Sequence, residues 1–491
     1  MIKMIFELGH YVTVALLHAD ASGALQYRAA LQVMADSVPT TVEVPSATTP
    51  ARGAAGLGRA AGTFRALRHR NFKLFFSGQI ISLVGTWMQT VAQSWLIYRL
   101  TGSGTLLGWL GFVGQFPIFL FSPIAGLAAD RWPRRRVVIA TQTISMLLAF
   151  ILAALTLSGH IGPQRVKEST FEIIGLATLL GIVNAFDVPA RQSFLIEMVG
   201  REDLLNAIAL NSSMFNGARV AGPAIAGALV VLVGEGWCFL LNGLSYLAVI
   251  AGLLMMRIVK SKPLHDGAAP LDKLREGFRF ARHTKPIRAL LSLVALVSFM
   301  ALPFVVLMPI FAVKILHGGA SAYGTLMGAV GVGAMFGALV LAMRQQLRGL
   351  GNVVAFAATG LGISLMLFSA SRWYWISFAI LIVTGFSMMM QFTATNTLIQ
   401  AMVPDQLRGR VMSMYAMMFL GMTPIGSLFA GALADHLGAP IIVAVGGLAS
   451  CLGGLFFARK WPALRGPVRD LVAAQGMMSP PAPTTPSAPA S

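Results

Sequence analysis

The 491-residue chain contains only two cysteines, and few of its residues carry a charge. Cys238 and Cys451 lie near or within apolar stretches, so the sequence predicts neither a disulfide framework nor a thiolate metal site. Charged residues make up 11% of the chain and hydrophobic residues 56%, whereas roughly a quarter of the residues in a soluble domain are charged. This scarcity of charge argues against a soluble globular protein.

Acidic residues are particularly scarce, with 18 Asp and Glu against 37 Lys and Arg and a net charge of +19. Such an excess could indicate nucleic-acid binding, but the basic residues sit at helix ends rather than on one continuous face. We therefore expect their partner to be the anionic cytoplasmic leaflet of a lipid bilayer, and no nucleic acid.

Signatures of enzymatic chemistry are also missing. The glycines at 331, 333 and 337 lie inside an apolar run with no preceding strand, so they favour close helix packing over nucleotide binding. The sequence has no phosphate loop, no cluster of His and acidic residues for a metal, and no nucleophile and base pair. We expect no enzyme, no metal and no cofactor, with an ion gradient, most simply of protons, as the energy source.

Long apolar runs dominate what is present. Twelve of them lie near 72–98, 104–129, 137–158, 171–190, 206–233, 237–256, 287–313, 320–343, 352–371, 373–398, 411–434 and 438–458. Each is long enough to cross about 30 Å of hydrocarbon as a helix. The sequence therefore predicts an all-α polytopic membrane protein with twelve transmembrane helices.

Basic residues are sorted by loop parity. With both termini inside, 31 of the 37 Lys and Arg fall in the tails or in loops that would be cytoplasmic, five fall in the other loops, and Arg219 lies within a span. Membrane proteins retain their positive loops on the cytoplasmic side during insertion. We expect a multi-pass protein of the cell inner membrane with both termini in the cytoplasm.

The spans repeat. Residues 226–229 and 430–433 are both Ala-Gly-Ala-Leu, 204 residues apart, as are Val199 and Val403 in a second matched segment. We interpret the chain as two six-helix halves, 72–256 and 287–460, joined by a basic linker, 257–286, in which residues 271–282 could form an amphipathic helix on the membrane surface. Transporters with two parallel halves bind substrate between them near the midplane.

The two ends of the chain differ from the spans. Residues 36–62 and 466–491 are rich in small residues and proline, and we expect disordered cytoplasmic tails at 1–71 and 461–491. Because residues 1–33 fit no recognisable element, Met34 is an alternative start.

A loop signature connects the second and third runs. Residues 126–136, Gly-Leu-Ala-Ala-Asp-Arg-Trp-Pro-Arg-Arg-Arg, resemble the signature loop of the major facilitator superfamily, with Pro133 where the general pattern has Gly. The resemblance implies a latch on the cytoplasmic side, in which an acid pairs with neighbouring arginines and a facing helix N-terminus. Its residues here are Gly126, Asp130, Arg131, Arg134 and Arg135.

Two further stretches refine the resemblance. Residues 184–194 and 216–227 are similar to the superfamily branch that includes the enterobactin exporter and macrolide-efflux proteins. Gly222, Pro223 and Gly227 in the second stretch resemble an antiporter motif of the fifth helix. Both likenesses imply export rather than uptake.

Arg219 lies roughly 18 Å into its span at 1.5 Å per residue, where a charge needs a partner or a water-filled cavity. Asp187 is the nearest plausible acid in sequence, and Arg191 follows it one turn later. We interpret Asp187, Arg191 and Arg219 as the coupling and ion-pair residues, with Asp187 as first choice for the proton site. A static pair that joins two helices is the alternative to a pair that exchanges partners.

A polar stripe follows the first span at helical spacing: Gln79, Ser82, Thr86, Gln89 and Gln93. Polar side chains avoid lipid, so we expect the stripe to line a substrate cavity, with Asn184 nearby and Gln391 and Asn396 from the second half. Hydrogen bonding between helices without substrate is the alternative.

Together these patterns predict a monomeric secondary exporter of amphipathic organic molecules, by proton antiport and alternating access. A catecholate siderophore and a macrolide drug are the substrates that the resemblance implies. A metabolite facilitator or importer, and a non-transporting sensor or scaffold on a transporter fold, remain alternatives.

Overall fold

The computed structural model describes residues 64–200, 202–257, 278–344, 347 and 349–475, apart from the side chains of 122, 123 and 126–131. All regular structure in this part of the chain is helical. The alternative start at Met34, most of the predicted linker and most of both predicted tails lie outside the described residues.

Six long helices form the first half. They are α4 (Arg70–Thr101), α5 (Gly104–Arg131), α6 (Arg134–Leu157), α7 (Val166–Val199), α8 (Leu204–Leu232) and α9 (Glu235–Met255), with short 3-10 helices η1 (Arg65–Arg68) and η2 (Pro163–Arg165). Proline occurs inside α7 and α8, at Pro189 and Pro223, without ending either helix.

The second half repeats this plan with two interrupted spans. Its helices are α11 (Lys285–Met300), α12 (Phe304–Ile310), η3 (Phe311–Ile315), α13 (Ala320–Ala342), α14 (Leu350–Ala370), α15 (Tyr374–Met402), α16 (Asp405–Ala416), η4 (Met417–Gly421), α17 (Met422–Leu437) and α18 (Ala439–Ala474). The segments α11, α12 and η3 form one span, and α16, η4 and α17 form another. Pro303 lies at the break between α11 and α12, where the missing N–H interrupts the helix.

Eleven spans in the described residues are long and apolar enough to cross a membrane. The helix α4 is long enough, at 32 residues, but is not one of the eleven. The predicted stripe of glutamines and hydroxyl residues lowers its hydropathy. Twelve membrane-crossing helices in two halves are therefore consistent with the fold, with α4 as the twelfth and most polar.

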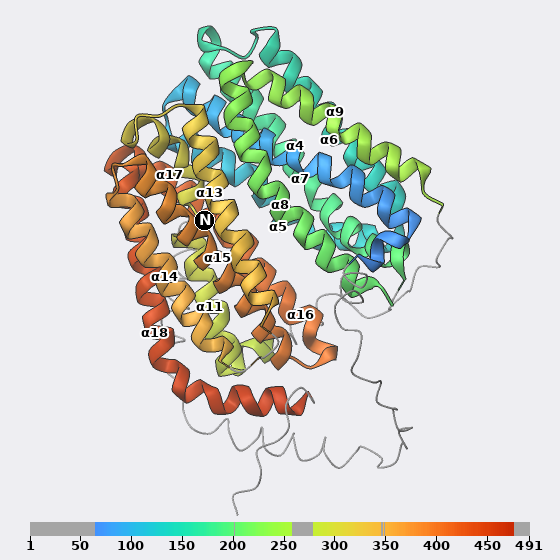
Figure 1. The fold of residues 1–491 in the computed structure, drawn as a ribbon, viewed down its shortest axis with the longest axis vertical. Helices are drawn as coiled ribbons and strands as arrows, with labels where there is room; N and C mark the ends of the chain where they lie inside the picture. Colours follow the sequence, from blue (N-terminus) through green and yellow to red (C-terminus); the bar gives the residue numbers. More distant parts are fainter. Residues whose placement is uncertain (1–63, 201, 258–277, 345–346, 348, 476–491) are drawn as a thin grey trace, which may run out of the picture. The chain divides into compact units, whose positions relative to one another are not determined.

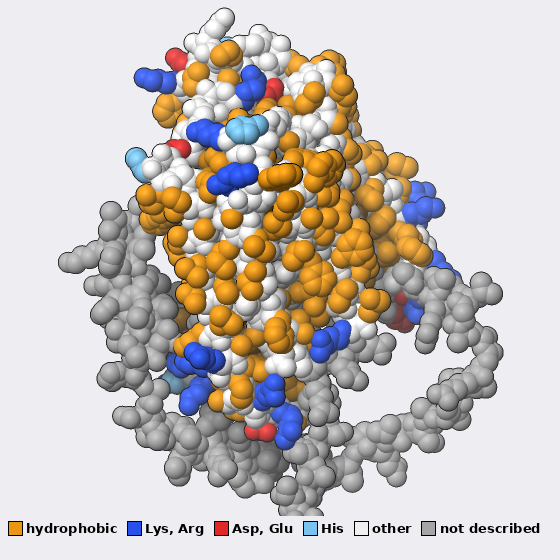
Figure 2. Space-filling model, turned by 60° about the vertical axis from the view of Figure 1, so that its left-hand side comes forward, with side chains coloured by type: hydrophobic (Ala, Val, Ile, Leu, Met, Phe, Trp, Pro, Cys, Tyr) orange, Lys and Arg blue, Asp and Glu red, His pale blue; other side chains and the backbone are white. Residues whose placement is uncertain are grey.

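The lateral surface is apolar. Figure 2 shows hydrophobic side chains gathered in a broad band on one face, with Lys and Arg side chains mainly toward its two ends. Large exposed side chains on that surface include Phe356, Leu367 and Leu452. Such a band matches the hydrocarbon layer of a bilayer, where apolar side chains need no burial in protein.

The halves lie side by side and diverge toward one end in Figure 1. We call the end where α4 begins and α18 finishes the termini end, and the opposite end, with the turns at Gly102 and Gly438, the far end. The surface between the halves, formed by α5 against α17 and by α8 against α13, is called the seam.

The helix α18 extends further than the sequence indicated. The last span was expected to finish near residue 458 and a disordered tail to begin at 461, but α18 continues to Ala474. Trp461, Leu464, Val468 and Val472 recur at helical spacing and are buried, which explains why this segment is ordered. Figure 1 shows this part of α18 turning across the termini end.

Order also begins earlier than the expected boundary at residue 72, because η1 packs on the start of α8. The Ala66 N–H donates to Asn206 Oδ1 over 2.9 Å, and Ala66 is fully buried.

Candidate functional site

The seam is narrowest at the far end, where α5 and α17 cross at glycines. A Cβ placed on Gly431 would lie 2.4 Å from the Gly104 carbonyl oxygen and 2.8 Å from the Gly108 Cα. A Cβ on Gly108 would lie 2.6 Å from the Ser427 carbonyl oxygen. Only hydrogen side chains allow the two backbones to approach this closely, as in other small-residue crossings of membrane helices.

A carboxylate closes the same crossing. Asp435 in α17 accepts hydrogen bonds from the backbone N–H groups of Gly104 and Thr105, at 2.6 and 2.8 Å, and from the hydroxyls of Ser103 and Thr105, at 2.9 and 2.7 Å. The second half thus supplies the N-terminal cap of α5 in the first half. An anion at a helix N-terminus satisfies otherwise unpaired N–H groups and interacts favourably with the helix dipole.

The second crossing joins α8 to α13. A Cβ on Gly324 would lie 2.4 Å from the Pro223 carbonyl oxygen and 2.6 Å from the Gly227 Cα. Gly222, which directly precedes Pro223, instead faces α4, where a Cβ placed on Gly222 would lie 2.4 Å from the Trp87 Cβ. The residues of the predicted antiporter motif therefore give α8 two close-packed faces, one toward its own half and one toward the other.

Arg219 lies on α8 at the seam. Its guanidinium Cζ is 5.7 Å from the centroid of the Trp87 ring in α4, and its Nη2 is 3.9 Å from the Met388 Sδ in α15. The Arg219 backbone also packs against Gly331 of α13. In the described residues, Arg219 forms no ion pair with a carboxylate.

Asp187 is buried in the first half, with 3% of its surface exposed. Its Oδ1 accepts hydrogen bonds from Thr141 Oγ1 at 2.7 Å and Gln142 Nε2 at 3.0 Å, both in α6. Its Oδ2 lies 3.2 Å from Arg191 Nε, one turn further along α7.

This arrangement corrects the expected pairing of Asp187 with Arg219. The partner of Asp187 is Arg191, because residues four apart lie on the same face of a helix and need no second helix to meet. The structure therefore separates the three predicted ion-pair residues into a satisfied pair and a cation at the seam.

The polar stripe of α4 lies inside the first half. Gln79, Ser82, Gln89 and Gln93 are all buried. Gln89 Oε1 accepts a hydrogen bond from Asn242 Nδ2 of α9 at 2.7 Å, and Gln93 Nε2 donates to the Ile173 carbonyl of α7 at 3.4 Å. Thr86 donates to the Ser82 carbonyl within α4. This placement favours the alternative of hydrogen bonding between helices.

The remaining predicted cavity residues lie at different depths. Gln391 in α15 is fully buried, and neither atom of its side-chain amide has a hydrogen-bond partner in the described residues. Asn396, one turn further along α15, accepts a hydrogen bond from Gln400, and Asn184 in α7 is half-buried.

The arginines of the predicted latch bond within the first half. Arg134 Nη1 lies 2.7 Å from Glu197 Oε1 of α7, and Arg135 donates to the Leu253 and Leu254 carbonyls, at 2.8 and 2.9 Å, near the end of α9. Cations stabilise a helix C-terminus in this way. The side chains of Gly126, Asp130 and Arg131 lie outside the described residues, so the rest of the latch stays a prediction.

A second acid at the termini end anchors η1. Asp203 lies 2.8 Å from Arg65 Nε and 2.8 Å from His69 Nε2. The hydrogen bond to His69, together with the nearby Arg65 and His69 charges, holds the pKa of Asp203 below its usual value of 3.8, against a smaller opposing effect of burial.

No group of three or more His, Cys, Asp or Glu side chains that could hold a metal ion occurs in the described part of the chain. At the seam, the Arg219 guanidinium lies against an indole ring and a thioether.

Comparison with known proteins places this geometry in context. A family model described as "Transmembrane secretion effector", within the major facilitator superfamily, matches residues 61–481. Among curated relatives, the staphyloferrin A transporter of Staphylococcus aureus (strain NCTC 8325 / PS 47) is 26% identical over 78% of this chain and 95% of its own length.

Two efflux proteins are also similar. The multidrug efflux pump Tap of Mycolicibacterium fortuitum is 25% identical over 72% of this chain and 87% of its own length. Macrolide efflux protein A of Streptococcus pyogenes is 23% identical over 76% and 92%. The fold also resembles a bacterial homologue of the iron transporter ferroportin, with a TM-score of 0.61, 15% identity, and coverage of 79% of this chain and 98% of that one.

Proposed function

This chain belongs to the major facilitator superfamily, and from that premise we propose that it is a secondary active exporter of amphipathic organic molecules, driven by proton antiport across the cell inner membrane. The named substrates of its relatives, a siderophore, drugs and macrolides, support a substrate of this kind. The observation that carries the proposal is the seam, where two six-helix halves meet through separable contacts around Arg219.

The termini end faces the cytoplasm in this proposal. Basic residues concentrate in the tails, in the loops and at the helix ends of that side, including Arg134 and Arg135 at the start of α6 and Arg288 at the start of α11. Retention of positive loops on the cytoplasmic side supports this orientation. The far end, with its turns at Gly102 and Gly438, then faces outward.

Substrate enters from the cytoplasm while the far end is closed. The cap that Asp435 places on α5 and the glycine crossing beside it hold the outer ends of the halves together. Release to the outside requires those bonds to break as the halves rock about the seam. Hydrogen bonds to water can replace the lost contacts, so the exchange is reversible.

Asp187 serves as the coupling acid. As a carboxylate it holds Arg191 in a buried pair. When a proton binds to the Asp187 carboxylate, the acid becomes neutral and its attraction for the Arg191 guanidinium is lost. A pair that exists in only one protonation state can link proton binding to the positions of α6 and α7.

The test uses inside-out proteoliposomes with an acidic lumen and labelled staphyloferrin A or erythromycin outside. We expect accumulation in the lumen that collapses with an uncoupler. The Asp187→Asn protein should keep downhill exchange but lose accumulation, while a matched Asp470→Asn variant on the exposed part of α18 should behave as wild type. Movement of substrate only downhill in the wild type would identify a facilitator, and no movement across a broad panel would favour a sensor.

A further inference from the structure

Arg219 is a half-buried charge at the seam for which the described residues provide no counter-charge. The acids of the described spans have other partners: Asp187 pairs with Arg191, Glu235 with Arg99, and Glu197 with Arg134. Asp435 is held by the start of α5. An arginine at membrane depth with no anion is costly, so a function that supplies the anion is the natural explanation.

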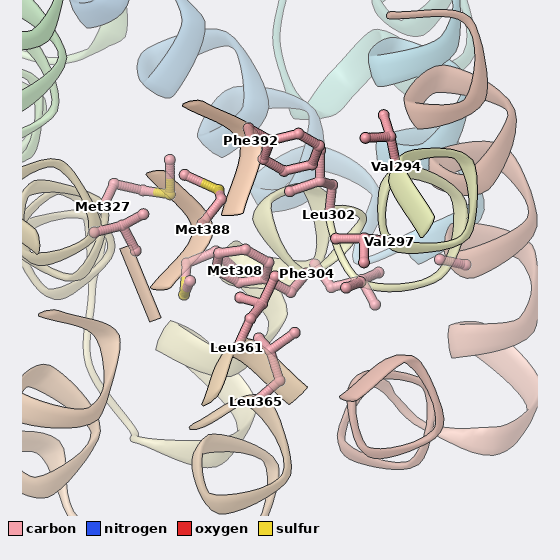
Figure 3. Packing of buried hydrophobic residues seen from close by; sticks show 14 of the residues in the cluster. Val294, Val297, Leu302, Phe304, Met308, Met327, Leu361, Leu365, Met388 and Phe392 are labelled. Atoms are coloured by element: carbon pink, nitrogen blue, oxygen red, sulfur yellow. The ribbon is translucent and has the colours of Figure 1, made fainter. Parts of the chain in front are cut away.

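The surroundings of the guanidinium are apolar and come from both halves. On one side lies the Trp87 ring, itself packed edge-on against Phe215 at 5.7 Å between centroids. On the other side lies Met388, whose side chain points toward Met327 and lies near Phe392 and Met308 in Figure 3. Thioethers and aromatic rings adapt to varied organic surfaces.

Gln391 provides an independent sign of a missing ligand on the same face of α15. It follows Met388 by three residues, which places the two on one side of the helix. Both its amide oxygen and its amide nitrogen are buried without a partner. Buried amides are normally bonded, and an orphaned one calls for an unseen partner.

We propose that Arg219 is the specificity-determining residue of the transport site and that the exported molecule is an amphipathic organic anion carrying a carboxylate. The planar guanidinium binds a carboxylate through two parallel hydrogen bonds, while Trp87, Phe215 and Met388 contact the apolar part. This inference rests on the proposed export function and names the substrate class of the same site.

The positive charge of Arg219 also determines which charge a bound molecule should carry. A cationic molecule of equal size would meet an unpaired positive charge and bind more weakly. The site therefore selects by charge at Arg219 and tolerates varied shape at the aromatic and thioether walls.

The test compares two xanthene dyes of similar size and opposite charge, carboxyfluorescein and rhodamine 6G, by fluorescence polarisation on the full chain in nanodiscs. For the wild type we expect carboxyfluorescein to bind more tightly. Arg219→Gln should weaken carboxyfluorescein binding by roughly tenfold to a hundredfold, the usual value of a charge-assisted hydrogen bond. The same variant should leave rhodamine 6G binding unchanged or tighten it.

Three further variants separate charge from folding. Arg219→Lys should recover only part of the anion affinity, because an ammonium cannot bind a carboxylate in bidentate fashion. Met388→Glu keeps Arg219 but supplies it with an internal carboxylate, so it should also weaken carboxyfluorescein binding. Arg372→Gln, which removes an arginine from an exposed turn at the far end, is the matched control and should change neither dye.

The inference is overturned if Arg219→Gln weakens both dyes equally, if it leaves carboxyfluorescein binding intact, or if the wild type binds only rhodamine 6G. Transport of the same dyes into proteoliposomes distinguishes a failure of this inference from a failure of the proposed function. Uphill movement of a dye with no charge preference would leave export standing and remove the anion site. Arg219-dependent anion binding without uphill movement would support the anion site and contradict the proposed export.

Discussion

Asp187 and Arg219 are two charged residues of the first half that differ in the partners that surround their charge. Asp187 has two hydrogen bonds and an ion pair, all from residues of its own half. Arg219 has an indole face and a thioether, and it lies where the halves meet. Removing a charge from water is costly in both cases, but among the described residues only Asp187 has a partner of opposite charge. Asp187 therefore has its counter-charge within its own half, whereas Arg219 has no carboxylate partner among the described residues.

The largest expected effect comes from removing the charge of Asp187, which has an ion-pair partner in Arg191. Asp187→Asn leaves the Arg191 guanidinium without its partner, so we expect the protein to lose about 3 kcal/mol of stability and its uphill transport. Thermal unfolding in nanodiscs measures the first effect and proteoliposome accumulation the second. Arg191→Gln is the matched variant, and a double-mutant cycle should give a coupling energy above about 1 kcal/mol. Additive effects of the two changes would contradict the pair.

Removing the uncompensated charge should have the opposite sign on stability. In Arg219→Met, an apolar side chain replaces a cation without a counter-ion, so the ligand-free protein should be unchanged or more stable by about 1 kcal/mol. Thermal unfolding of the ligand-free protein provides the measurement. A loss as large as that of Asp187→Asn would show that Arg219 is a structural cation, and the contrast between the two charges would disappear.

Asp435 is intermediate between Asp187 and Arg219, because its hydrogen-bond donors belong to the other half and we expect them to be lost when the far end opens. Asp435→Asn should shift the equilibrium toward a far-end-open state by roughly tenfold, since charge-assisted bonds and the dipole interaction at α5 are weakened. Spin labels at the exposed residues Gln164 and Trp373, one in each half, should report longer distances. Unchanged distance distributions would show that the glycine crossing alone closes the seam.

The smallest effect concerns a half-buried acid at the termini end, Asp203. The pKa of Asp203 is lowered in the folded protein, chiefly by His69, so its contribution is present above the unfolded pKa and is lost as the pH falls through the folded value. Below about pH 4, residues 65–69 should detach from the turn before α8, and amide hydrogen exchange there should accelerate. Asp203→Asn should exchange rapidly at all pH values, whereas Glu202→Gln, one residue earlier, should not.

Most of the fold could be predicted from the sequence because a bilayer imposes simple rules on length and polarity. The apolar runs predicted the order of the long helices, and their bounds agree within a few residues for most spans. The predicted number of twelve is consistent with the eleven apolar spans and α4. The end of α18 was missed because Trp461, Leu464, Val468 and Val472 recur too sparsely among prolines and charges to form an apolar run. A helical-period search beyond the last span could have found it.

The site was predicted less well, since pairing depends on depth and rotation. Asp187, Arg191 and Arg219 were predicted as ion-pair residues, but which of them pair could not be predicted. Pairing between residues four apart on one helix competes with pairing between two helices. The stripe on α4 was correctly identified as inward-facing, yet it packs against α7 and α9. Only the structure reveals that Asp435 caps a helix of the other half.

The most direct test of the account measures thermal unfolding of wild type and Arg219→Gln in nanodiscs, with and without saturating carboxyfluorescein. A ligand at a hundred times its Kd stabilises the folded state by about 2.7 kcal/mol. We predict a higher Tm for the wild type with the anion and a clearly smaller shift for Arg219→Gln at the same concentration, because a tenfold to hundredfold weaker Kd leaves about 0.4 to 1.4 kcal/mol of stabilisation. With rhodamine 6G the shift of Arg219→Gln should be at least as large as that of the wild type. An equal upward shift of both proteins with carboxyfluorescein would contradict the claim that substrate supplies the missing charge at the seam.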